Sequence, residues 1–367
     1  AADASAMSAP LLPRRGCCSG WLGPSLVLFG SGFFAVANAF GKAYEQTGGT
    51  VGTLLLTRGV LSWLFNGLLA RSGGEPLLNV LFFRGITRRR LLALLLLNGV
   101  LNAICVQLLF ITLESLVTFG DTFVIIIGVY TVAVFVLSRL LGRSERVTLV
   151  ELIGGSLTVL GVALVSQPSW LFGTLSERPV APLGVLLLVI AGTAVGASNV
   201  GFRSLTQSGA TPAQCNSALQ GTLGYWAIVV LLLCVAATGG KPPHWSQLQP
   251  PSSFIATLPL LAYVVSITLA QLCFMHGIKR VRSGTAAVLG NLEIVFASII
   301  GATALGQPTN LLSVLGNLVV FAGASLVAYG AAKEKPAAAA AESGEVRMAA
   351  VRVSVKGEPD EGELRVY

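Results

Sequence analysis

The chain has 367 residues and a net charge of +8, and hydrophobic residues make up 54% of it while charged residues make up only 11%. This share of charge is about half that of soluble domains, which excludes an ordinary soluble fold. The charges gather in short clusters between long apolar stretches, so the sequence predicts an integral membrane protein whose charged clusters mark the loops.

Apolar stretches of membrane-spanning length recur along the whole chain. A transmembrane helix needs roughly 20 mostly apolar residues to cross about 30 Å of hydrocarbon. Membrane strands would alternate polar and apolar residues, whereas LLALLLLNGVL at 91–101 is continuously apolar. We therefore predict an all-α integral membrane fold of ten transmembrane helices, at about 22–44, 50–70, 91–113, 117–141, 147–166, 182–204, 213–238, 254–276, 284–305 and 310–332.

The basic residues predict the orientation. With a cytoplasmic N-terminus, only Lys42, Arg178 and Lys241 fall in outer loops, and most other basic residues fall on the inner side. Both termini are then cytoplasmic, in the plasma membrane or an endomembrane. This asymmetry also accounts for the net charge, so we expect no nucleic-acid partner. Residues 1–21 form a cytoplasmic N-terminal segment, and 333–367, mixed in charge and poor in large apolar groups, form a disordered cytoplasmic tail.

One phrase occurs twice in the chain. Residues 37–50 read ANAFGKAYEQTGGT and residues 198–211 read SNVGFRSLTQSGAT. Likewise, VQLLF at 106–110 matches AQLCF at 270–274, and ELIGGSLTVLGVALV at 151–165 matches SVLGNLVVFAGASLV at 313–327. Because the second copy follows an odd number of crossings, the copies run in opposite directions. We predict two inverted five-helix repeats, 22–166 and 182–332, joined by a loop at 167–181. This architecture is typical of secondary transporters, although a duplicated scaffold would also show it.

A family resemblance rests on two stretches of the sequence. GDTFVIIIGVYTVAVFVLSRLLGRSERVTLVELIGGSLTVLGVALVSQPSWLFG closes the first half, and SGTAAVLGNLEIVFASII lies in the second. Over about 22–332 the chain resembles the EamA-like branch of the drug/metabolite transporter superfamily, nearest to eukaryotic G-type members of the nucleotide-sugar-transporter-related solute carriers. The resemblance implies export or exchange of a small organic metabolite, such as an organic or nucleotide-linked anion. The chain departs from the family pattern at Tyr130 and Glu293, where a proline is usual, and at Gln307, where an acidic residue is frequent.

Two ionisable residues are predicted near the middle of the membrane. Arg58 lies about 12 Å below the outer surface and Glu293 about 13 to 14 Å above the inner one, from the helical rise of 1.5 Å per residue. Charges at this depth mark functional sites by default. We predict that Arg58 binds an anionic group of the substrate while Glu293 binds a competing proton or a cationic group. A structural ion pair between them is the alternative.

Amide side chains at equivalent depths in the two halves are further candidates. Asn38 matches Asn199, and Gln107 matches Gln271. They are expected either to line a substrate path or to bond neighbouring helices. Asp121, near the outer surface, is an alternative partner for Arg58 or else a surface acid.

The sequence predicts no cofactor, no metal and no enzymatic activity. The string GSGFFA at 30–35 lies inside an apolar span rather than between a strand and a helix, and no H-E-x-x-H or paired C-x-x-C motif occurs. The predicted partners are a small-molecule metabolite and membrane lipids, with a homodimer left open. The alternatives to transport are a membrane scaffold or regulatory protein and a lipid-handling protein.

Overall fold

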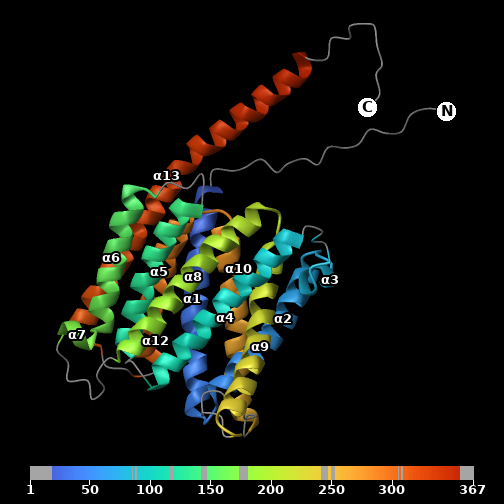
Figure 1. Ribbon diagram of the computed structural model, residues 1–367. Coiled ribbons are helices and arrows are strands. Elements are labelled where there is room, and N and C mark those ends of the chain that lie inside the picture. The colour runs from blue at the N-terminus through green and yellow to red at the C-terminus, as the bar shows by residue number, and fades with distance from the viewer. Residues whose placement is uncertain are drawn as a thin grey trace.

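The computed structural model describes residues 19–84, 86, 89–115, 119–141, 147–172, 181–240, 247–248, 253–304, 306 and 309–355. Within these ranges the regular structure is helical throughout, and ten helical spans are long and apolar enough to cross a membrane, as predicted. The helices stand side by side in one bundle (Figure 1). Their bounds are α1 Ser19–Gln46, α2 Val51–Ser72, α3 Leu77–Leu81, α4 Arg89–Ser115, α5 Phe119–Leu141, α6 Leu149–Ser166, α7 Ser169–Phe172, α8 Pro182–Gln207, α9 Pro212–Ala237, α10 Phe254–Ile278, α11 Ser283–Gly290, α12 Leu292–Ala304 and α13 Leu311–Val355.

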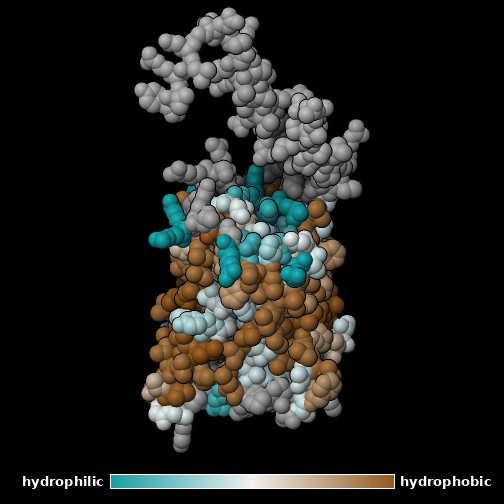
Figure 2. Space-filling model, turned by 90° about the vertical axis from the view of Figure 1, so that its right-hand side faces the viewer, coloured by the Kyte–Doolittle hydropathy of each residue, from teal (hydrophilic) through white to brown (hydrophobic). Residues whose placement is uncertain are grey.

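The outer surface of the bundle is apolar around its middle. Figure 2 shows this belt in brown, with hydrophilic side chains gathered towards one end. Large side chains such as Leu140, Leu232 and Phe254 expose 61% to 76% of their surface. So much exposed apolar surface is unfavourable in water and matches hydrocarbon. The chain is thus an integral, multi-pass membrane protein.

The two ends of the bundle differ in charge. The helix ends at one side carry most of the arginines, and we call this side the arginine-rich end; it includes Arg71, Arg89, Arg139, Arg203 and Arg282. The opposite end holds the turn between α1 and α2.

The repeated phrase builds the same turn in both halves. Gly48 and Gly209 adopt left-handed φ values of 84° and 104°, which residues with a side chain rarely adopt. Two residues later, Thr50 and Thr211 cap the next helix by accepting a bond from the backbone amide three residues on. The similarity of these stretches therefore has a local structural cause.

The helix pairs stay the same when each helix is replaced by its counterpart in the other half. α1 packs along α10, and its counterpart α8 packs along α4; α5 packs on α8 as α12 packs on α1; α2 pairs with α9 and α6 with α13. The α6–α13 contact depends on the glycines that the sequence matched. A Cβ on Gly161 would lie 2.7 Å from the Gly316 carbonyl oxygen, and one on Gly323 would lie 2.7 Å from the Gly154 carbonyl oxygen. Small residues here let the two backbones approach closely.

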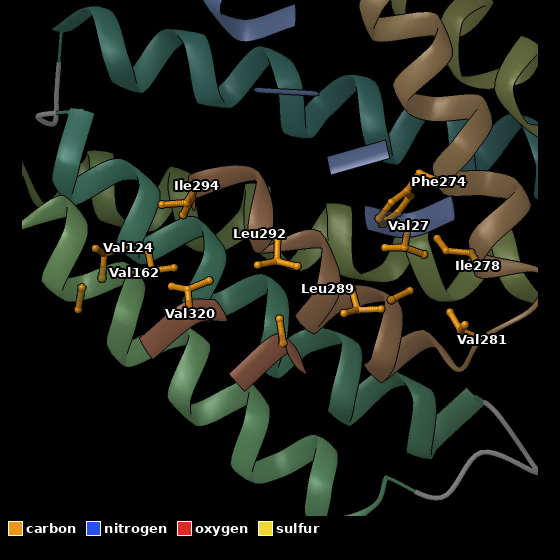
Figure 3. Close-up of a cluster of buried hydrophobic side chains, with 13 residues drawn as sticks. Val27, Val124, Val162, Phe274, Ile278, Val281, Leu289, Leu292, Ile294 and Val320 are labelled. Carbon is orange, nitrogen blue, oxygen red and sulfur yellow. The ribbon is translucent and has the colours of Figure 1, made fainter. Parts of the chain in front are cut away.

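Both halves also share one buried apolar cluster. It includes Val124 and Val162 from the first five spans and Leu292, Ile294 and Val320 from the last five (Figure 3). The halves therefore pack as one unit in this structure rather than as two separate bundles.

Two features differ from the predicted spans. The ninth span is broken at Asn291 into α11 and α12. In addition, α13 runs beyond residue 332 as far as Val355 (Figure 1), where a disordered tail was predicted. The alanines at 337–341 have high helix propensity, whereas Pro336 before them disfavours a continuous helix. Residues 356–367 and 1–18 lie outside the described part of the chain.

Candidate functional site

The break in the ninth span places Glu293 at the start of a helix in the middle of the membrane. The Asn291 amide crosses to the first half, where it donates to Thr158 Oγ1 at 3.1 Å and to Thr131 Oγ1 at 3.4 Å. The Leu289 carbonyl, next to the break, accepts a bond from Ser31 Oγ at 3.2 Å. The interruption is one residue long, because Asn291 keeps a right-handed helical conformation and its backbone amide still bonds the Ala287 carbonyl.

Glu293 accepts a hydrogen bond from another predicted site residue. Asn38 Nδ2 of α1 donates to Glu293 Oε1 at 2.6 Å. Glu293 is half-buried and Asn38 is exposed. Part of the surface of this pair is therefore left uncovered by the packing of α1 and α12.

The equivalent position in the other half repeats the contact without a charge. Asn199 Nδ2 of α8 donates to the Tyr130 hydroxyl of α5 at 2.7 Å, and both residues are buried. Tyr130 matches Glu293 in the repeat as Asn199 matches Asn38. Sequence reasoning noted Tyr130 only as a departure from the family pattern, and its partner could have been inferred from this equivalence.

Arg58 lies buried in α2 with few partners. Its side chain is 7% exposed, Nη1 donates to the Tyr263 hydroxyl of α10 at 3.2 Å, and Nε has no hydrogen-bond partner among the described residues. Within the described residues no carboxylate oxygen comes within 4.0 Å of the guanidinium, so Arg58 and Glu293 do not form the predicted alternative of an ion pair. Their charges nevertheless attract each other through space. Nothing in the sequence around Tyr263 pointed to this contact.

One of the two predicted glutamines, Gln271, belongs to a different set of contacts. Gln271 accepts a bond from Gln220 of α9, and both are buried. A second buried set joins α2 to α9, where Asn66 Nδ2 bonds Ser217 Oγ at 2.6 Å and Asn216 Nδ2 bonds Asn66 Oδ1 at 3.1 Å. Gln271 thus bonds a neighbouring helix, while Asn66, Asn216 and Gln220 were not among the predicted residues. The spacing of Asn216 and Gln220, four residues apart in an apolar span, was the signal that sequence reasoning missed.

Gln107 and Asp121 are not drawn into these contacts by the described part of the structure. Gln107 is buried in α4 and forms no hydrogen bond there to another predicted site residue. Asp121 lies in the first turn of α5, and its side chain is outside the described residues, so its predicted pairing with Arg58 stays a prediction.

The two ends of the bundle differ in packing around this site. At the arginine-rich end, all residues of α11 from Ser283 to Leu289 are buried, as are the first nine of α9, Pro212–Gln220. Beyond the break only Leu292, Ile294 and Gly301 of α12 are buried. The partly exposed pair of Asn38 and Glu293 thus lies on the less densely packed side. In the described residues no group of three or more His, Cys, Asp or Glu side chains is placed to hold a metal ion.

Comparison with known proteins supports this reading of the fold. Residues 182–329, from the start of α8 to within α13, match the model of the EamA-like transporter family. No match is found among the curated proteins. Of 28 matching chains in solved structures, one crystal structure of a protein is similar over 86% of this chain and 98% of its own, with a TM-score of 0.62 and 15% identity, which shows a shared fold alone. The chain is an integral, multi-pass membrane protein whose second five spans match the EamA-like transporter family.

Proposed function

We propose that the chain is a secondary transporter that carries a small organic anion across a membrane by alternating access, without covalent chemistry. The match of the second half to a transporter family supports this, as does the packing of two five-helix halves that contact each other in equivalent ways. Inverted repeats allow one half to rock against the other around a shared site, which opens the site to either side in turn.

The buried Arg58 guanidinium is the single observation that carries the choice of an anion. A charge removed from water is costly unless a partner compensates it, and among the described residues its only hydrogen bond goes to a neutral hydroxyl. A carboxylate or phosphate on the substrate would supply the missing partner, because guanidinium nitrogens match the geometry of both groups. We therefore propose that the Arg58 guanidinium binds an anionic group of the substrate.

Glu293 gives the proposed transporter a means of coupling. It is half-buried, bound by one amide, and attracted by Arg58 without touching it. We propose that Glu293 exchanges a proton, or binds a cationic group, in step with the anion at Arg58. Asn38 orients its carboxylate, and Asn199 with Tyr130 forms the neutral counterpart in the other half.

The finer assignments follow from the sequence. We place the chain in the EamA-like branch of the drug/metabolite transporter superfamily, nearest to the eukaryotic G-type solute carriers, with both termini in the cytoplasm. The arginine-rich end then faces the cytoplasm. A homodimer is compatible with this assignment but is not needed for it, because both halves of the site come from one chain.

The decisive experiment combines ligand screening with flux. Purified protein is heated with panels of organic anions, cations and neutral metabolites, since a ligand of the native fold raises its apparent stability. Anions that stabilise it are then tested for uptake into proteoliposomes. Stabilisation and flux for anions are expected. Stabilisation by cations alone would refute the anion site; lipid movement without solute flux would support a lipid-handling protein; and no flux for any stabilising ligand would support a scaffold.

A further inference from the structure

A buried carboxylate outside the candidate site joins the two halves at the arginine-rich end. Glu151, in the first turn of α6, is only 4% exposed. Its Oε2 atom accepts bonds from Thr148 N at 2.9 Å and from Thr148 Oγ1 at 3.1 Å, while Glu151 N donates to Thr148 Oγ1 at 3.2 Å. These bonds form a capping box, which accounts for one oxygen of the carboxylate and leaves the other available.

The second oxygen reaches across to the other half. Glu151 Oε1 accepts a bond from Thr285 Oγ1 at 2.9 Å, and Thr285 lies in the first turn of α11. The approach is close, since a Cβ on Gly284 would lie 3.3 Å from Glu151 Oε1. This bond, which we call the α6–α11 contact, ties the buried half of the broken ninth span to the fifth span.

The opposite end of the bundle lacks the equivalent bond. In the repeat, Ser313 of α13 matches Glu151, and Thr122 of α5 matches Thr285 by the same offset that relates Tyr130 to Glu293. Thr122 is fully buried, yet among the described residues its Oγ1 atom has no hydrogen-bond partner. Ser313 Oγ bonds instead to the Val165 carbonyl and to Gln167 Nε2, each at 3.4 Å. The same pair of positions is thus joined by a hydrogen bond at one end and not at the other.

We propose that the α6–α11 contact is the latch that holds the arginine-rich end closed, and that it must break for the site to open there. α11 is buried along Ser283–Leu289 in this structure, whereas beyond the break Asn38 is exposed and Glu293 is half-buried, an asymmetry that closure at the arginine-rich end would produce. A hydrogen bond to a carboxylate is roughly twice as strong as a neutral one. A serine in the equivalent place makes a weaker latch, so the resting state favours closure at the arginine-rich end.

The test measures hydrogen exchange of α11 in the full-length protein in lipid nanodiscs. Thr285→Val keeps the shape of the side chain and leaves the Thr148–Glu151 cap of α6 intact, so it removes the latch alone. Exchange of the amides in 283–290 is expected to rise about tenfold or more, from the usual contribution of a hydrogen bond to a charged group. Thr285→Ser retains the hydroxyl, so its amides in 283–290 should exchange at the parent rate. Thr122→Val removes a hydroxyl without a partner among the described residues and should leave the exchange of 283–290 unchanged.

Two results would overturn the proposal. Unchanged exchange of 283–290 in Thr285→Val would show that the contact does not hold α11 in place. An equal rise in every helix would show general loosening rather than release of one segment. The role of the latch in transport rests on the proposed function, but this readout does not: selective release of α11 in a protein that carries no solute would refute transport and leave the latch standing.

Discussion

Replacing Arg58 by methionine should separate ligand binding from stability. In the ligand-free protein, the guanidinium makes one 3.2 Å bond to a neutral tyrosine, worth about 0.5 to 1.5 kcal/mol. Removal of a buried cation that has no carboxylate partner among the described residues offsets this loss. We therefore expect the melting temperature without ligand to stay unchanged or to rise.

Binding should weaken strongly in the same variant. A bond from a charged group contributes about 1.5 to 3 kcal/mol, and a bidentate contact with an anion provides two. Since about 1.4 kcal/mol is tenfold in affinity, the loss is at least about a hundredfold. Thermal stabilisation by the transported anion, measured by titration, should disappear together with proteoliposome uptake at equal protein incorporation.

The matched control for this prediction lies at the same contact. Tyr263→Phe removes the neutral partner but keeps the guanidinium, so the anion affinity should change only about tenfold or less. The anion-site assignment is refuted if Arg58→Met takes up solute with a half-saturating concentration like that of the parent. A variant that unfolds would instead show that Arg58 serves the fold.

Three further changes test other parts of the structure. Glu293→Gln keeps the bond to Asn38 but loses the exchangeable proton, so the pH dependence of uptake should flatten; an unaltered pH profile would remove protons from the mechanism. Tyr130→Phe, in the neutral equivalent of that contact, should leave the pH profile unchanged and lower the melting temperature only slightly. Gly161→Val forces a side chain against the Gly316 carbonyl and should destabilise the protein by about 1 to 3 kcal/mol in thermal unfolding. Gly32→Ala is its control, because the new Cβ would lie 3.9 Å from Phe296, and equal melting temperatures for the two variants would contradict the close α6–α13 contact.

The sequence predicted the spans because membrane helices depend on a local signal, and it contained the small residues of one helix contact without identifying the partner helices. Apolar length alone defines a membrane helix, so all ten predicted spans correspond to spans of the structure. The matched glycines of α6 and α13 meet at their helix contact because small residues are what a close approach requires. The left-handed turns at Gly48 and Gly209 were likewise present in the repeated phrase, although their conformation was not recognised.

The faces that meet in the centre could not be predicted in this way. The stretch SGTAAVLGNLEIVFASII contains no proline, so nothing local indicated the break at Asn291; that break depends on Thr131 and Thr158 of distant helices. Arg58 and Glu293 were expected at similar depth, but depth does not determine rotation about a helix axis, and their different partners follow from that rotation. Glu151 shows the same limit, since its capping box is readable from the sequence whereas its bond to Thr285 is not.

The differences between the halves affect which side of the membrane the proposed site faces, as well as what the site binds. A duplicated bundle with identical halves would have two states that exchange the roles of the halves. One would be open to each side of the membrane, and their free energies would be equal. This chain has a carboxylate on one side only at two equivalent pairs, Glu293 against Tyr130 and Glu151 against Ser313. Glu293 and Tyr130 both accept a bond from the other half here, whereas Glu151 does so and Ser313 does not. In the proposed transporter, Glu151 would therefore stabilise this state more than the one related to it by exchange of the halves. A difference of about 1.4 kcal/mol populates two states ten to one, and a ligand must then bind the minor state more tightly to reverse that ratio. Substitution of Glu151 should therefore change which side of the membrane the empty transporter faces.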